Sequence, residues 1–189
     1  LVSIEENEAS LRNPYLLGLA LLKIGDLYAE QRVNEKALVA YQKCQEIFSK
    51  MRLPVGEAEI CAAFGKWFLQ QGDLVQAEDF LSRSLQLYDS LGLGFKYTRS
   101  QLLYAHFLWR KKDFIGARAS LTEILEKLPE QDFPFERGIA LRLFAISTLS
   151  LGNLNDAMQA LDESERLLKN IDAEYELAQT YYEKAKIYF

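Results

Sequence analysis

The chain has 189 residues, of which 49% are apolar and 26% are charged, a balance that is typical of a folded globular protein and excludes a disordered one. The formal net charge of −5 argues against nucleic acid as the main partner, because phosphate binding needs a concentrated surface of lysine and arginine. Proteins and small ligands are the partner classes that the composition leaves open.

The sequence gives little support to membrane insertion, metal binding or catalysis. The longest uncharged apolar stretch, residues 15–22, is too short to span a bilayer. His106 is the only histidine, which removes multi-histidine metal sites and a Ser-His-Asp triad. Cys44 and Cys61 lack metal-ligand spacing, and two small buried side chains in a reducing cytoplasm are favoured over a disulfide. We therefore predict a cytoplasmic protein that is not an enzyme and holds no metal or cofactor.

A unit of 40 residues repeats along the chain. Four alanines mark it, each preceded by a glycine or alanine twelve residues earlier, and each of those small residues is followed three residues later by a larger one. The alanines are Ala37, Ala77, Ala117 and Ala157. The small residues are Gly25, Gly65, Ala105, Ala145 and, continuing the series, Ala185. The larger residues are Tyr28, Phe68, Leu108, Thr148 and Tyr188, of which Thr148 is the one weak member. Four residues after each alanine stand Tyr41, Leu81, Leu121 and Leu161.

Apolar residues recur at intervals of three and four within each half of the unit, which predicts two amphipathic helices per unit. The small residue lets the two helix axes approach, and the large residue fills the groove beside that contact. In chain order, the predicted helices cover 14–31 with 34–50, 55–71 with 74–90, 95–110 with 114–128, 135–150 with 154–169, and 173 to the end. Asn13 before Pro14, and Asn34, Asp73, Asp113 and Asn153 before the second helices, are the predicted N-caps.

The predicted organisation is a single repeat domain over residues 1–189. Its full units are 14–50, 55–90, 95–128 and 135–169, and residues 173–189 form the first helix of a further unit. Residues 1–12 carry Leu1, Ile4 and Leu11 on one face and are expected to end a preceding second helix. We therefore expect the natural protein to continue beyond both ends.

These positions resemble the tetratricopeptide (TPR) repeat over essentially the whole chain. The stretches 71–73 and 151–153, Gln-Gly-Asp and Leu-Gly-Asn, are similar to its inter-helix turn, and Pro129 is similar to its unit-ending proline. The unit is longer than the family's usual length of about 34 residues, and no tryptophan occupies the early first-helix position. The longer helices are similar to those in arrays of MalT-like activators and of LGN or kinesin light-chain scaffolds, and the stretch 173–185 resembles the arrays of bacterial signalling proteins. The resemblance implies an all-α, right-handed superhelix of about four hairpins whose concave face binds peptides or partner proteins.

The inner face of the first helices predicts a ligand groove. Its candidate residues are Lys66, Arg99, His106, Trp109, Arg110 and Arg142. Because most of these side chains are cationic or aromatic, the expected partner is an acidic protein or peptide with an apolar anchor. The alternative is that the basic side chains are only a solvated helix surface.

The sequence favours a protein-interaction or scaffold module, a sensor or regulatory fragment of a larger signalling or transcription-regulatory protein. An RNA-binding helical repeat is an alternative, although Asp26, Glu30 and Glu59 interrupt the basic groove that it would need. An α/α enzyme would need inner carboxylates and breaks in the register, which is unbroken. The last helix leaves apolar residues with no following helix to cover them, which predicts end-to-end self-association. These residues are Leu177, Tyr181, Ala185 and Tyr188.

Overall fold

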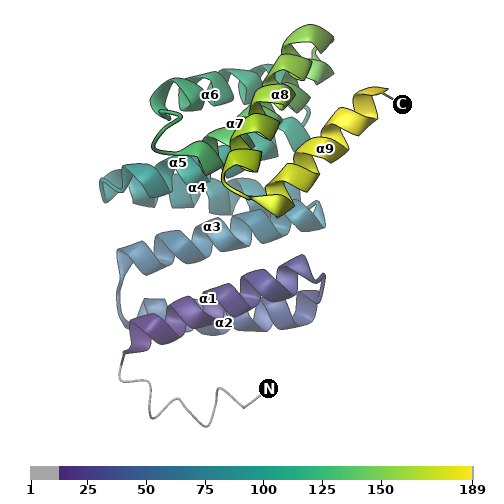
Figure 1. Cartoon of the computed structure of the whole chain (residues 1–189). Helices are drawn as coiled ribbons and strands as arrows, with labels where there is room; N and C mark the ends of the chain where they lie inside the picture. The colour runs from purple at the N-terminus through teal and green to yellow at the C-terminus, as the bar shows by residue number, and fades with distance from the viewer. Residues whose placement is uncertain (1–12, 189) are drawn as a thin grey trace. The chain divides into compact units, whose positions relative to one another are not determined.

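The computed structural model describes residues 13–188, and over this range the chain is built of helices without any β-strand (Figure 1). The helices of the described range are α1 (Pro14–Glu30), α2 (Asn34–Lys50), α3 (Pro54–Gln71), α4 (Leu74–Ser90), α5 (Gly94–Arg110), α6 (Phe114–Lys127), α7 (Pro134–Ser150), α8 (Leu154–Asn170) and α9 (Glu174–Tyr188). Every predicted helix is present, with ends that differ from the prediction by one residue at most. The all-α prediction is therefore confirmed for these residues. The predicted helix end at 1–12 lies outside them.

Four of the five predicted N-caps are confirmed. The Asn13 side chain accepts a hydrogen bond from the Tyr15 N–H at 3.0 Å, with Pro14 as the first helical residue. Asp73, Asp113 and Asn153 each accept a bond from the backbone N–H three residues further on. Each cap satisfies an N–H that has no partner within its helix, and so fixes where the helix begins.

The predicted cap at Asn34 is wrong. The N-cap of α2 is Val33, which makes no side-chain capping bond, and Asn34 is already the first helical residue. Its amide instead exchanges two hydrogen bonds with the amide of Gln71 at the end of α3, at 3.0 and 2.9 Å. The Asn34 side chain therefore joins two neighbouring 40-residue repeats and does not cap its own helix.

The chain divides into two compact units, Leu1–Tyr97 and Thr98–Phe189, each with its own core. In the first unit, α1 packs against α2 and α3, and α3 packs against α4. Its core is rich in aromatic rings, and the ring centroids of Tyr41 and Phe64 lie 5.4 Å apart. Glycines stand where these rings meet a helix backbone. A β-carbon on Gly18 or on Gly56 would lie 2.5 Å from the ring of Phe48.

In the second unit, α7 packs against α6, α8 and α9, and α9 also packs against α8. Leu102 and Ala105 of α5 share a core with Leu121 and Ile124 of α6 and with residues of α7. A second core joins α7 to α8. The small-against-large contact recurs there, because a β-carbon on Gly138 would lie 2.7 Å from the side chain of Leu168.

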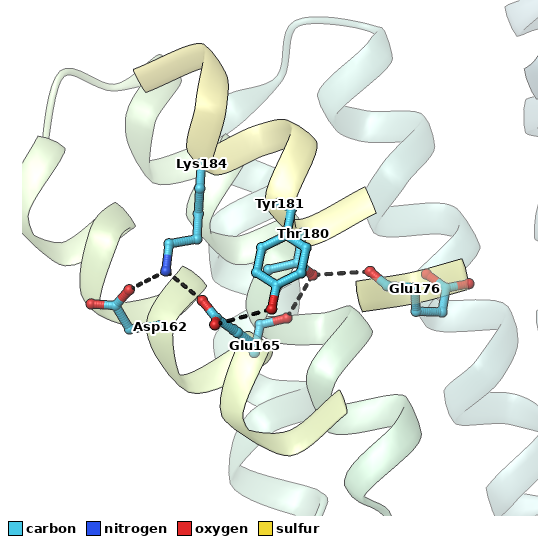
Figure 2. Close-up of polar contacts among 7 residues, drawn as sticks. Asp162, Glu165, Glu176, Thr180, Tyr181 and Lys184 are labelled. Carbon is cyan, nitrogen blue, oxygen red and sulfur yellow. Dashed lines mark hydrogen bonds and ion pairs between the residues drawn. The ribbon is translucent and has the colours of Figure 1, made fainter. Parts of the chain in front are cut away.

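Polar contacts hold α9 on α8 (Figure 2). The buried hydroxyls of Ser164 and Thr180 lie 3.1 Å apart, and Ser164 also donates to the Gly138 carbonyl at 2.8 Å. Lys184 donates to the carboxylates of Asp162 and Glu165 at 2.7 and 2.6 Å. Burial disfavours the charge on Lys184, but the bonds to these two carboxylates outweigh burial and hold its pKa above the usual value. One face of α9 is thereby fixed against α8.

Across the described residues, each helix is either too short or too polar to cross a lipid bilayer.

Candidate functional site

The six predicted groove residues fall into the two units. Lys66 belongs to the first unit and stands on α3, where its Nζ lies 3.6 Å from the Glu30 carboxylate of α1. Both side chains are largely exposed, so this pair contributes little to stability and lowers the positive charge that Lys66 offers to a ligand. The other five residues belong to the second unit, on α5 and α7.

Four of those five residues gather where α5 approaches α7. The ring centroids of His106 and Trp109 lie 5.9 Å apart. The Trp109 Nε1–H donates to the Ser150 hydroxyl of α7 at 3.2 Å, and that hydroxyl donates to the Ile146 carbonyl at 2.8 Å. This bond holds the indole beside the last turn of α7. We call this group of side chains the α5–α7 cluster; its members are His106, Trp109, Arg110, Arg142 and Ser150.

His106 is neutral at pH 7 in this setting. Burial lowers the pKa of its imidazole to about 4, and the charges of Arg110 and Arg142 lower it further in the same direction. A neutral imidazole offers one hydrogen-bond donor and one acceptor without adding to the positive charge.

Arg142 forms an ion pair within the protein and is not a free cation. Its side chain is only 13% exposed. Its guanidinium donates to the Glu176 carboxylate at 2.5 Å and to the Glu176 backbone carbonyl at 2.9 Å. Arg142 thus fixes α9 against α7, and Glu176 neutralises it. This pair could not be predicted from the spacing within one repeat, because Glu176 lies in the first helix of the next 40-residue repeat.

Arg99 stands apart from the cluster along α5. Its Nε lies 3.9 Å from the Glu136 carboxylate of α7, a side chain that is itself nearly buried. Lys66, Arg99 and Arg142 therefore each have a carboxylate from a neighbouring first helix within 4 Å. The basic character that the sequence predicts for the groove is reduced at these three places.

Arg110 differs from the other predicted cations. It is exposed in the last turn of α5, and no Asp or Glu oxygen of the described residues lies within 4 Å of its guanidinium. Its location near a helix C-terminus is electrostatically favourable for a cation. Arg110 is therefore the charged group of the α5–α7 cluster that can bind an anion without first breaking an ion pair.

Two further features bear on chemistry. Within the described part of the chain, no three His, Cys, Asp or Glu side chains lie close enough to hold a metal ion. A cavity of about 400 Å³ lies between α2, α3 and α4 of the first unit, with Glu57, Cys61 and Arg83 among its lining residues. Arg83 is ion-paired to Glu57, and burial raises the pKa of the Cys61 thiol to about 11. The Cys61 thiol therefore stays protonated at neutral pH.

Comparison with known protein families gives no match to this chain, and comparison with curated proteins gives no significant match.

Proposed function

We propose that the chain is a non-catalytic protein-interaction module of the tetratricopeptide type, which binds an acidic peptide segment of a partner protein at the α5–α7 cluster. One observation carries this proposal. Arg110 is an exposed cation without a carboxylate partner among the described residues; it follows Trp109 in the chain and lies one helical turn after the neutral imidazole of His106. The succession of helices and the 40-residue repeat support the assignment to the tetratricopeptide type.

Each member of the cluster supplies a different part of the recognition. The Arg110 guanidinium can form two parallel hydrogen bonds to one carboxylate, which a lysine cannot do. Trp109 is partly buried and its Nε1–H is already bonded to Ser150, so its ring is held in place as a surface for an apolar side chain. His106 can donate to or accept from the peptide backbone without repelling a nearby cation.

From the resemblance to the tetratricopeptide repeat, we infer that the helices form a right-handed superhelix whose first helices line the concave face. The chain would be a sensor or regulatory part of a larger signalling or transcription-regulatory protein in the cytoplasm. The buried free thiols of Cys44 and Cys61 are consistent with a reducing compartment.

A peptide array tests the proposal. Each peptide carries two or three acidic residues and one aromatic or aliphatic residue, and a matched array replaces every Asp and Glu by Asn and Gln. We expect the chain to bind members of the acidic array only. Arg110→Glu should weaken that binding at least about tenfold, since it replaces attraction by repulsion. The matched control is Arg118→Glu, another exposed arginine, on α6, which should bind as the unaltered chain does.

Equal binding to both arrays, or equal loss in both variants, would contradict the proposal. Salt-sensitive binding of single-stranded RNA in a filter assay, lost in Arg110→Glu, would instead support the RNA-binding alternative.

A further inference from the structure

One face of α9 is exposed and regularly patterned. Tyr175 is 70% exposed and Tyr182 is 61% exposed, and Ala178 and Ala185 are exposed as well. These four residues follow one another at intervals of three, four and three, so they form one stripe along the helix. The stripe lies on the side of α9 opposite to Thr180, the residue that is buried against α8.

The hairpins of this chain show what such a stripe packs against. In the pair α1 and α2, two small residues seven positions apart meet two aromatic residues seven positions apart. Gly18 faces Phe48 and Gly25 faces Tyr41, with room for no β-carbon at either glycine. The second helix runs antiparallel to the first, so the order of the large residues is reversed relative to the small ones.

Small residues of one helix meet large residues of the next in the second unit as well. Gly138 of α7 contacts Leu168 of α8, and Ala145 shares a core with Leu161. Ala178 and Ala185 stand 40 residues after Gly138 and Ala145. They are therefore the two small positions of a first helix, and on α9 they are exposed rather than covered by large side chains.

The stripe of α9 carries large residues with the same spacing as its small ones. Tyr175 and Tyr182 are seven positions apart, as are Ala178 and Ala185. Two α9 helices can be placed antiparallel and related by a two-fold axis that crosses the stripe at the level of Thr180. Ala178 then faces Tyr182 of the second copy, and Ala185 faces Tyr175 of the second copy. Each tyrosine then meets an alanine, which repeats the contact seen within the hairpins. The stripe is thus complementary to itself, as a two-fold interface requires.

We propose that in the 189-residue chain α9 pairs antiparallel with α9 of a second copy through the stripe Tyr175, Ala178, Tyr182 and Ala185. This pairing specifies the end-to-end self-association that the sequence predicts, and it does not depend on the α5–α7 cluster. The phenolic hydroxyls lie at the ends of long side chains and can remain in water at the rim. Glu183 and Lys186 beside the stripe neutralise each other at 2.8 Å, so they bring no like-charge repulsion.

The exposed area determines how tight the pairing can be. Tyr175 and Tyr182, the two large residues of the stripe, are 70% and 61% exposed. With about 200 Å² for a whole tyrosine side chain, they expose roughly 260 Å² in each copy, so their pairing buries about 500 Å² in total. That area lies below the usual range of specific interfaces, which begins near ~1,200 Å². We therefore expect a weak, reversible dimer with a dissociation constant toward the upper end of the micromolar range.

Sedimentation equilibrium of the full chain from about 5 to about 500 µM tests the proposal. The unaltered chain should pass from monomer to dimer over this range. Ala178→Glu should remain a monomer throughout, because it buries an unpaired carboxylate at the centre of the interface. The matched control, Ala119→Glu, makes the same change at an exposed alanine of α6 and should dimerise as the unaltered chain does. Circular dichroism confirms that each variant is folded.

A monomer at the highest concentration would overturn the pairing, and so would an Ala178→Glu variant that dimerises as well as the control. Arg110→Glu should dimerise normally, so loss of peptide binding and loss of the dimer are separate results.

Discussion

A β-carbon placed on Gly25 would lie 2.4 Å from Cε1 of Tyr41, closer than real side chains approach, so the ring of Tyr41 rests directly on the backbone of α1. At the equivalent place in the second unit, Ala145 shares a core with Leu161, so the small residue of this pair is an alanine. The size of one side chain therefore limits the size of the other across the hairpin. This relationship sets how closely the two helices of a unit approach.

Gly25→Ala should destabilise the fold although alanine favours a helix by about 1 kcal/mol over glycine. The added methyl group would push against Tyr41, and overpacking of this kind costs about 1 to 3 kcal/mol. We expect a net loss of about 1 kcal/mol in the free energy of unfolding, measured by urea denaturation. Gly94→Ala is the control, because a β-carbon there meets nothing within 4 Å. A control as destabilised as Gly25→Ala would show that steric contact is not the cause.

Thr148→Val should stabilise the second unit. Thr148 occupies a repeat position that larger side chains fill elsewhere, and it is fully buried. Its hydroxyl oxygen has no hydrogen-bond partner among the described residues. Replacing that hydroxyl by a methyl group of similar size removes the cost of its desolvation, so we expect a gain of about 1 kcal/mol in thermal or urea unfolding. A loss of stability would show that the hydroxyl is satisfied in solution.

His106 should titrate near pH 4 in the folded chain, against an ordinary value of about 6.5. As it is the only histidine, one imidazole C2–H resonance in a proton NMR titration measures this pKa directly. The unfolded chain binds the proton more readily, so the stability from neutral His106 is fully present above about pH 6.5 and is lost as pH falls toward 4. The loss is about 2 to 3 kcal/mol. His106→Gln should lack this dependence, and a resonance that titrates at 6.5 would contradict the burial of the ring.

Neither cysteine should react with a thiol reagent in the folded chain. Burial raises the pKa of Cys44 to about 12, with a further contribution from Glu59. Burial raises the pKa of Cys61 to about 11, although the charge of Arg83 acts in the opposite direction. The thiolate is the reactive form, so both groups remain protonated and shielded at pH 8. We expect no release of chromophore from Ellman's reagent in buffer and two equivalents in denaturant. Rapid reaction of one thiol in buffer would place that cysteine at the surface.

The helices and their register could be predicted from the sequence because their signals are local. The spacing of Gly25, Ala37 and Tyr41 within one 40-residue repeat defines both helices and their contact, and the next repeats have the same spacing. Where a partner lies in another 40-residue repeat, the sequence was less informative. The Asn34 side chain bonds to Gln71 of the next repeat instead of capping its own helix.

The candidate site shows the same division between local and distant signals. The position of Trp109 beside His106 follows from one turn of α5, and was predicted. The neutralisation of Arg142 depends on the rotation of α9 and on Glu176, which no helical periodicity specifies. The sequence therefore predicted a groove surface but not which of its cations are already paired, and the absence of a carboxylate partner at Arg110 depends on how the helices of the described residues pack.

The most direct test of the binding proposal is the fluorescence of Trp109. Trp67→Phe leaves Trp109 as the single tryptophan of the chain. Titration with an acidic peptide selected from the array should shift the Trp109 emission in a saturable way, and the additional change Arg110→Glu should abolish the shift while far-ultraviolet circular dichroism stays unchanged. Binding that leaves the Trp109 emission unaltered, or a shift that survives Arg110→Glu, would contradict the α5–α7 cluster as the binding site.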